Sequence, residues 1–249
     1  MDPEPFPVAD IDGEGSEFTL KAGQLLESVK RVSYAIPQQG GNATMSTMCL
    51  QAKDGQLNFV GLDGHVLAWD KIDYDGEFEL LIPKNTIDKL KTLGLTGEVR
   101  IRHSNAMAIF ATEDFEICTR LVQGEYYKYQ NMFKELPLHT VISRKELLDA
   151  MVRAKMCTAE KCPVKFEIAG SQLGLSIKDQ TTDYHETVDL QEDISEELTI
   201  GFDARLVIET LKAFDCDNVG ISLQGPKMPM IVEAEDSDFK TIVLPVAIK

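Results

Sequence analysis

The chain has 249 residues, of which 43% are hydrophobic and 27% charged, a composition typical of a folded protein with a sizeable core. No apolar run approaches the roughly 18 residues that a membrane-spanning helix needs, and the acidic, proline-rich start is unlike a signal peptide. The net charge of −16, taken alone, argues against a polyanionic partner. The five cysteines are scattered and odd in number, which implies no disulfide framework and favours the cytoplasm.

The first half of the chain is predicted to combine two helices with several strands. Residues 1–16 are expected to form a linker or an entry strand. The spacing of Leu25, Val29 and Val32 predicts a helix over 21–35, and a second helix is expected over 84–93, after Pro83. Asp54-Gly55 is a strong hairpin signal. The strands predicted here are 48–53, 56–61, 66–72, 77–82, 99–102, 106–111 and 115–122.

The second half repeats this order after a polar, aromatic connector at 125–137. Helices are predicted over 144–156 and over 204–214, the latter with Asp203 as its N-cap. The acidic pairs Glu192-Asp193 and Glu196-Glu197 are expected in a solvated loop. The strands predicted here are 164–168, 173–178, 186–190, 198–202, 219–223, 230–233 and 241–246.

Similar segments therefore occur twice, with a period of roughly 120 residues, far longer than a solenoid repeat. The repeated pairs are Phe18–Val32 with Val141–Ala154, Leu80–Leu93 with Leu198–Lys212, and Phe115–Val122 with Phe239–Val246. The duplication predicts two α+β domains, 17–124 and 138–249, and favours a pseudo-symmetric scaffold over a single catalytic cleft.

Charge is distributed unevenly along the chain. The four predicted helices carry 12 Lys and Arg against 5 Asp and Glu, whereas the remainder carries 13 against 36. Short helices can collect basic residues by chance. The alternative interpretation is a basic helical surface that faces a polyanion, with acidic surroundings that limit nonspecific binding.

Motifs for catalysis are missing. The sequence has no glycine-rich phosphate loop and no Gly-x-Ser-x-Gly elbow. The spacing of Cys157 and Cys162 matches no common zinc pattern, so we expect structural thiols and no metal. Asp63 and His65 could form a carboxylate–imidazole pair, but Asp63-Gly-His65 is better explained as a turn.

Four motifs resemble the bacterial sliding clamp, the beta subunit of DNA polymerase III. They are Gly61–Ala68, Leu121–Tyr129, Ile200–Lys212 and Ile242–Val246, similar in turn to the family's T-D-G-H-R-L-A loop, its interdomain connector, a segment of its last domain and its terminal strand. The similarity runs in the family's order over essentially the whole chain. It implies an α+β fold of two tandem clamp domains, corresponding to the second and third of the family's three.

The resemblance implies a processivity factor without catalytic activity or cofactor, located in the bacterial or phage cytoplasm at the nucleoid. Its expected partners are duplex DNA, bound independently of sequence, and polymerase and clamp-loader subunits, bound through short peptides with apolar anchors. Other clamp subunits would complete a ring if the missing first domain is present. The chain would be either a fragment without the first domain or a natural two-domain clamp of a phage or mobile element. A hydrolase that uses Asp63 and His65 is the alternative from another class.

The resemblance also implies site residues. The expected peptide-binding residues are Met45, Leu62, Gly64, His65, Val66, Leu67, Tyr127, Asn131, Met132, Val243, Leu244, Pro245 and Val246. From the helical charge, the DNA-facing candidates are Lys30, Arg31, Lys84, Lys91, Arg153, Lys155 and Lys212. The chain departs from the family's residues at Val66, Tyr127, Asn131 and the end Ala247-Ile-Lys249. These departures affect the expected peptide preference.

Overall fold

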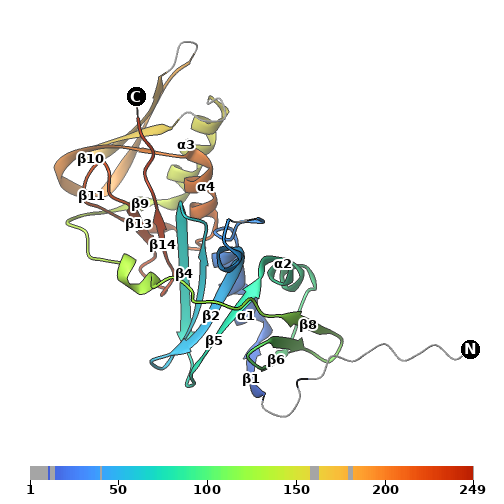
Figure 1. Ribbon diagram of the computed structural model, residues 1–249. Coiled ribbons are helices and arrows are strands. Elements are labelled where there is room, and N and C mark those ends of the chain that lie inside the picture. Colours follow the sequence, from blue (N-terminus) through green and yellow to red (C-terminus); the bar gives the residue numbers. More distant parts are fainter. Residues whose placement is uncertain (1–10, 12–14, 40, 158–162, 179–181, 249) are drawn as a thin grey trace, which may run out of the picture.

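The structure, a computed structural model, describes residue 11 and residues 15–39, 41–157, 163–178 and 182–248. These ranges form two tandem α+β halves (Figure 1). The helices are α1 Ala22–Ser33, α2 Lys84–Thr92, α3 Arg144–Met156 and α4 Ala204–Lys212, with short 3-10 turns η1 Ala43–Ser46 and η2 Tyr129–Met132. None of the helices in the described part of the chain is long and apolar enough to cross a membrane.

Strands of the first half are β1 Ser16–Lys21, β2 Thr47–Lys53, β3 Gln56–Leu62, β4 Val66–Asp73, β5 Phe78–Pro83, β6 Glu98–His103, β7 Met107–Ala111 and β8 Glu116–Arg120. Strands of the second half are β9 Leu138–Ser143, β10 Val164–Lys178, β11 Asp183–Phe202, β12 Asn218–Leu223, β13 Met230–Glu233 and β14 Lys240–Val243. The repeated sequence segments occupy equivalent places, because β1–α1 corresponds to β9–α3 and β5–α2 to the end of β11 with α4.

Each helix has one apolar stripe that is buried against strands. On α1, Leu25, Val29 and Val32 are fully buried at helical spacing, as the sequence predicts. The later helices begin at side-chain caps: Ser143 Oγ accepts the Glu146 N–H of α3, and Asp203 Oδ1 accepts the Arg205 N–H of α4 at 2.8 Å. The predicted N-cap Asp203 is therefore confirmed.

One sheet continues from the first half into the second. Its ten strands follow the order β10-β11-β9-β12-β13-β14-β4-β3-β2-β5, while β1-β6-β7-β8 form a separate four-stranded sheet. The two halves meet where β14 pairs antiparallel with β4 through four residue pairs, from Lys240 with Trp69 to Val243 with Val66. We call this pairing the seam.

The two faces of the long sheet carry separate apolar clusters. Successive side chains of a strand point to opposite faces. Ala68 and Val243 consequently join the large core that includes the buried residues of all four helices. Leu67 and Ile242 join a smaller cluster beneath the connector. In Figure 1 the helices and the connector with η2 lie on opposite sides of β4 and β14.

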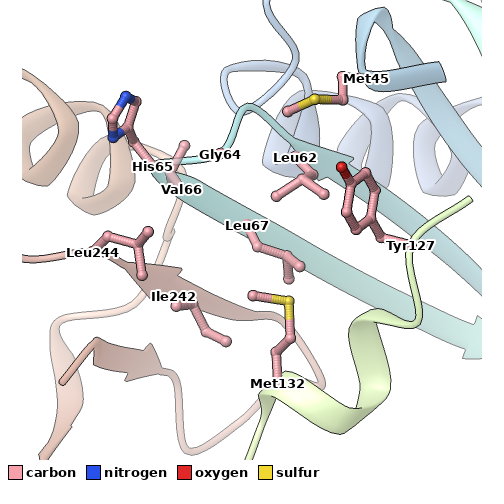
Figure 2. Close-up of a pocket in the computed structure, with 10 residues that line it drawn as sticks. All are labelled: Met45, Leu62, Gly64, His65, Val66, Leu67, Tyr127, Met132, Ile242 and Leu244. Carbon is pink, nitrogen blue, oxygen red and sulfur yellow. The ribbon is translucent and has the colours of Figure 1, made fainter. Parts of the chain in front are cut away.

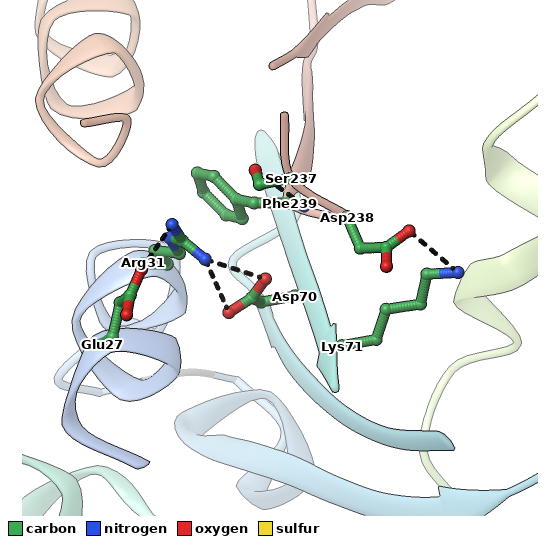
Figure 3. A network of polar contacts seen from close by, with 7 residues as sticks. All are labelled: Glu27, Arg31, Asp70, Lys71, Ser237, Asp238 and Phe239. Atoms are coloured by element: carbon green, nitrogen blue, oxygen red, sulfur yellow. Dashed lines mark hydrogen bonds and ion pairs between the residues drawn. The ribbon is translucent and has the colours of Figure 1, made fainter. Parts of the chain in front are cut away.

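Polar contacts on both faces of β4 join the two halves at the far end of the seam, with Asp70 on the helix side and Lys71 on the connector side (Figure 3). The Arg31 guanidinium of α1 lies 3.4 Å from both carboxylate oxygens of the buried Asp70 and forms an ion pair with Glu27. Its central carbon is 5.7 Å from the centroid of the Phe239 ring of the second half. Lys71 and Asp238 form a second ion pair between the halves, at 3.1 Å. We call these contacts the latch.

The predicted helices are confirmed to within two residues at each end, and α3 has the predicted bounds. Several strand predictions are wrong. Segments 164–168 and 173–178 form one strand, β10, and segments 186–190 and 198–202 form β11. The acidic pairs Glu192-Asp193 and Glu196-Glu197 lie in β11 and not in a loop, although they are exposed. The linker or entry strand expected over 1–16 lies mostly outside the described residues, and β1 begins at its last position, Ser16. β9 has no counterpart among the predicted strands, and β14 ends at Val243 and not at 246.

Candidate partner-docking pocket

The floor of the candidate site is set by strand register. Leu62 of β3 is paired with Leu67 of β4, and Leu67 is paired with Ile242 of β14. The three residues belong to the smaller apolar cluster and are almost completely buried. The floor therefore contains residues of both halves and exists only where the seam is formed.

A tight turn between β3 and β4 forms one wall. Asp63 Oδ1 accepts the main-chain N–H groups of His65 and Val66, both at 2.8 Å, and the Asp63 N–H donates to the Val66 carbonyl. Gly64 has a φ of +87°, which L side chains rarely adopt. The Asp63-Gly64-His65 segment is thus a turn, as the sequence indicates.

The connector forms the opposite wall and is held by buried tyrosines. Tyr129 donates a hydrogen bond to Gln51 Oε1 at 2.9 Å and contacts the edge of Trp69, with ring centroids 5.3 Å apart. Burial raises the pKa of the Tyr126 and Tyr129 hydroxyls well above the usual value, so both stay neutral. With its neighbours fixed, the connector presents Tyr127 and Met132, which are 50% and 40% exposed.

The segment after β14 closes the remaining side. The Leu244 N–H donates to the His65 carbonyl at 2.8 Å, and the Val246 N–H donates to the Gly201 carbonyl at 2.8 Å. The open pocket between these walls has a volume of about 160 Å³ and an almost wholly apolar lining (Figure 2). It is lined by Met45, Leu62, Gly64, His65, Val66, Leu67, Tyr127, Met132, Ile242 and Leu244.

Nine of these lining residues are among the thirteen expected from the sequence. Ile242 is absent from the expected residues, which include its neighbour Val243 instead. This assignment is wrong because Val243 points to the opposite face of β14 and is fully buried in the large core. Asn131, Pro245 and Val246 lie next to the pocket along the chain but do not line it. Alternation along β14 was the signal that could have identified Ile242.

The seven candidates for DNA contact all lie on the helices, but their surroundings differ. Lys84 is buried. Its Nζ donates a hydrogen bond to the Ser33 carbonyl at 2.8 Å and forms an ion pair with Asp88. Arg31 is bound in the latch. These two side chains hold elements together and present no free charge, which corrects their assignment.

The other five candidates reach the surface. Lys91 donates to Ser33 Oγ at 2.8 Å, and its pKa is lowered by partial burial and then by neighbouring Lys84. Arg153 pairs with Glu186, and Lys212 with Glu209. Lys155 is exposed on α3. Lys30 is exposed on α1 and has no ion pair within the described ranges.

The geometry does not favour a hydrolase. Asp63 directs its carboxylate at main-chain N–H groups, and no hydrogen bond joins it to the His65 ring among the described residues. Within the same ranges, no three His, Cys, Asp or Glu side chains gather as metal ligands. Cys162, considered with Cys157 as a metal site, lies outside the described residues.

Two α+β domains that share one sheet, with an apolar pocket at their seam, define a class of tandem-domain scaffold proteins. Two sequence models match the chain: the central domain of the DNA polymerase III beta subunit over residues 19–128, and its C-terminal domain over residues 134–247. The chain belongs to the family of the DNA polymerase III beta subunit, the sliding clamp.

Individual relatives agree. The chain is 26% identical over 239 residues to the beta sliding clamp of Proteus mirabilis, covering 92% of this chain and 64% of that one. It superimposes with a TM-score of 0.91 on the Pseudomonas aeruginosa beta subunit at 24% identity, covering 98% and 69%. For the Bartonella birtlesii clamp bound to griselimycin the TM-score is 0.90 at 20% identity, again covering 98% and 69%. The chain spans about two thirds of the length of the curated relatives it matches.

Proposed function

We propose that this protein is a sliding clamp that tethers replication proteins to DNA by holding short peptides in the pocket at the seam. The observation that carries the proposal is the pocket itself. It is deep enough for apolar side chains, it is made from both domains, and it belongs to a chain whose family is that of the sliding clamp. Apolar anchors buried in such a groove provide most of the affinity in peptide recognition.

The proposed partners are polymerase and clamp-loader subunits that carry clamp-binding peptides. Solved clamps of Bartonella birtlesii and Pseudomonas aeruginosa are bound to griselimycin, which supplies a probe for this chain. We propose no catalytic activity for the protein itself, and a cytoplasmic location at the nucleoid.

Calorimetric titration with griselimycin, and with a short peptide carrying leucine anchors, tests the docking function. Leu244→Ala removes an apolar wall and is expected to weaken binding at least tenfold, because a truncated anchor contact costs more than about 1.4 kcal/mol. The matched control is Leu206→Ala, a partly buried leucine of α4 on the other side of the sheet. Equal binding by both variants and the parent would refute docking at this pocket.

The DNA function needs a ring, to which this chain would contribute two of the domains. Contacts with DNA would then be electrostatic and independent of sequence. Light scattering over a concentration series distinguishes a monomer, which needs further clamp domains, from a trimer, which closes a six-domain ring by itself. An assembled ring is expected to stay on a nicked circular plasmid and to slide off after the plasmid is linearised. Equal retention on both would contradict encirclement.

A further inference from the structure

A second hollow lies beside the docking pocket on the same face of the long sheet. It has a volume of about 420 Å³, against about 160 Å³ for the pocket. It is formed by the connector on one side and by strands of the second half on the other. Its lining residues are Phe133, Lys134, Glu135, Leu136, His139, Ser222, Ile231, Glu233 and Lys240.

Neighbouring residues line the floor and the wall of the two hollows. Ile242, which lines the pocket, is paired across β14 and β13 with Ile231, which lines the second hollow. Both isoleucines belong to the cluster beneath the connector. Met132 lines the pocket and the next residue, Phe133, lines the second hollow. A chain that leaves the pocket past Met132 would therefore enter the second hollow.

The second hollow offers hydrogen bonds without net charge. Lys240 and Glu233 neutralise each other at 2.9 Å, and Lys134 and Glu135 contribute one charge of each sign. Ser222 Oγ lies 3.0 Å from His139 Nδ1, so both polar groups border the apolar floor. Among the described residues, the main-chain N–H and C=O groups of Lys134, Glu135 and Leu136 have no hydrogen-bond partner. A strongly charged ligand would gain little here, whereas an extended polypeptide could pair with the connector.

We propose that the second hollow holds the flank of the same partner peptide, as an extended segment with uncharged polar side chains. The proposal rests on the docking function and adds that the site contacts more of the partner than its apolar anchors. The flank would lie along residues 134–136 and over Ile231. One or two net hydrogen bonds predict at least about fivefold tighter binding than the anchors give alone.

Fluorescence polarisation with three labelled peptides tests this inference. The first peptide has the leucine anchors only, the second adds four Ser and Gln residues at its amino end, and the third adds them at its carboxyl end. One extension is expected to bind at least about fivefold tighter than the short peptide. If neither does, the inference is wrong even when the short peptide binds. If the short peptide and griselimycin both fail to bind, the proposed function falls and the inference falls with it.

A variant that blocks the second hollow tests whether the tighter binding of the extended peptide arises there. His139→Trp places a large ring in the hollow and is expected to abolish the gain from the flank while leaving the short peptide's affinity unchanged. His185→Trp is the matched control, because His185 is also an exposed strand histidine opposite a serine, Ser176 of β10. A gain that survives in His139→Trp overturns the proposal. If His139→Trp does not fold, Glu135→Pro serves instead, because it removes one main-chain N–H of the connector. It is expected to reduce the additional affinity of the extended peptide. An undiminished additional affinity in this variant overturns the proposal.

Discussion

Asp63 illustrates how one side chain can decide the shape of a site without facing a ligand. Its carboxylate accepts two main-chain N–H groups and fixes the turn that places His65 beside the pocket. The same residue was the candidate acid of the hydrolase alternative. Its two hydrogen bonds explain its presence without any catalytic function.

Replacing Asp63 separates these roles. Asp63→Ala loses both acceptor bonds and is expected to lower the free energy of unfolding by about 1–2 kcal/mol and to weaken griselimycin binding severalfold. Asp63→Asn keeps an acceptor oxygen and should retain most of the stability and most of the affinity for griselimycin. Urea unfolding and calorimetry provide the two readouts. An asparagine variant as impaired as the alanine variant would show that the charge, and not the turn, is needed.

Asp203 gives a prediction for pH. The Arg205 side chain, and then its main-chain N–H, hold the pKa of this carboxyl below its usual value. The ionised form therefore stabilises α4 above the unfolded pKa of about 3.9, and this contribution is lost as pH falls through the lower folded pKa. Asp203→Ala should cost about 1 kcal/mol at pH 7.

Asp203→Asn keeps the cap but cannot titrate. Its stability, measured by urea unfolding between pH 5 and pH 3, should fall less steeply than that of the parent protein. Equal slopes would mean that other carboxylates dominate the acid response.

The residue scale is also where prediction from sequence was least complete. The resemblance identified most of the pocket because the residues of each motif are close together in the sequence. Ile242 and Val243 could be distinguished only by knowing which face of β14 meets the connector. Likewise, a helical lysine has the same sequence signature whether it is exposed, as Lys30 is, or buried with a partner, as Lys84 is.

At the scale of elements, helices were predicted better than strands. Each helix has its own apolar stripe, so local periodicity determines it. Strands depend on distant partners. The acidic segment around Glu192 and Glu197 has a polar composition typical of a loop, yet β10 pairing beside it extends β11 through register shifts. The pairing of β14 with β4, on which the pocket depends, has no local signal.

The latch gives a prediction about this interdomain contact. Burial raises the pKa of Asp70, and the Arg31 guanidinium opposes that shift. Arg31→Met leaves a buried carboxylate without its partner and should destabilise the fold by about 3 kcal/mol at pH 8. The pKa of Asp70 then rises further, so the cost of its ionisation is present at high pH and shrinks as pH falls. The loss should therefore be smaller at pH 5.

Two further variants test this explanation by urea unfolding at both pH values. Arg31→Lys keeps the positive charge and should lose less stability than Arg31→Met. Adding Asp70→Asn to Arg31→Met should restore part of the stability and remove the additional pH dependence. A double variant that is no more stable than Arg31→Met would contradict the role assigned to the buried charge.

At the scale of the whole molecule, the long sheet separates the two proposed activities. The docking pocket lies on the connector side, and the basic helices pack on the other. A docked peptide and DNA would therefore not compete for one surface. The acidic remainder of the chain accounts for the net charge of −16 without contradicting a DNA-binding face.

Lys30 offers the clearest test of that face. If it contacts a phosphate in the assembled ring, Lys30→Ala should weaken duplex binding for all sequences and reduce the slope of log affinity against log salt by about one. Lys53→Ala, which removes an exposed lysine at the end of β2, is the control and should leave the slope unchanged. Identical slopes for the parent and Lys30→Ala would exclude Lys30 as a contact.

The seam has a mechanical consequence. If a proposed partner pulled on a docked peptide, the force would act at the end of the seam where Leu244 is bonded to His65. Load perpendicular to the strands would break the pairs in turn, starting with Val243–Val66 and ending with Lys240–Trp69. The latch lies at that last pair and would arrest the rupture. The pocket would thus release its cargo by local opening before the two domains separate.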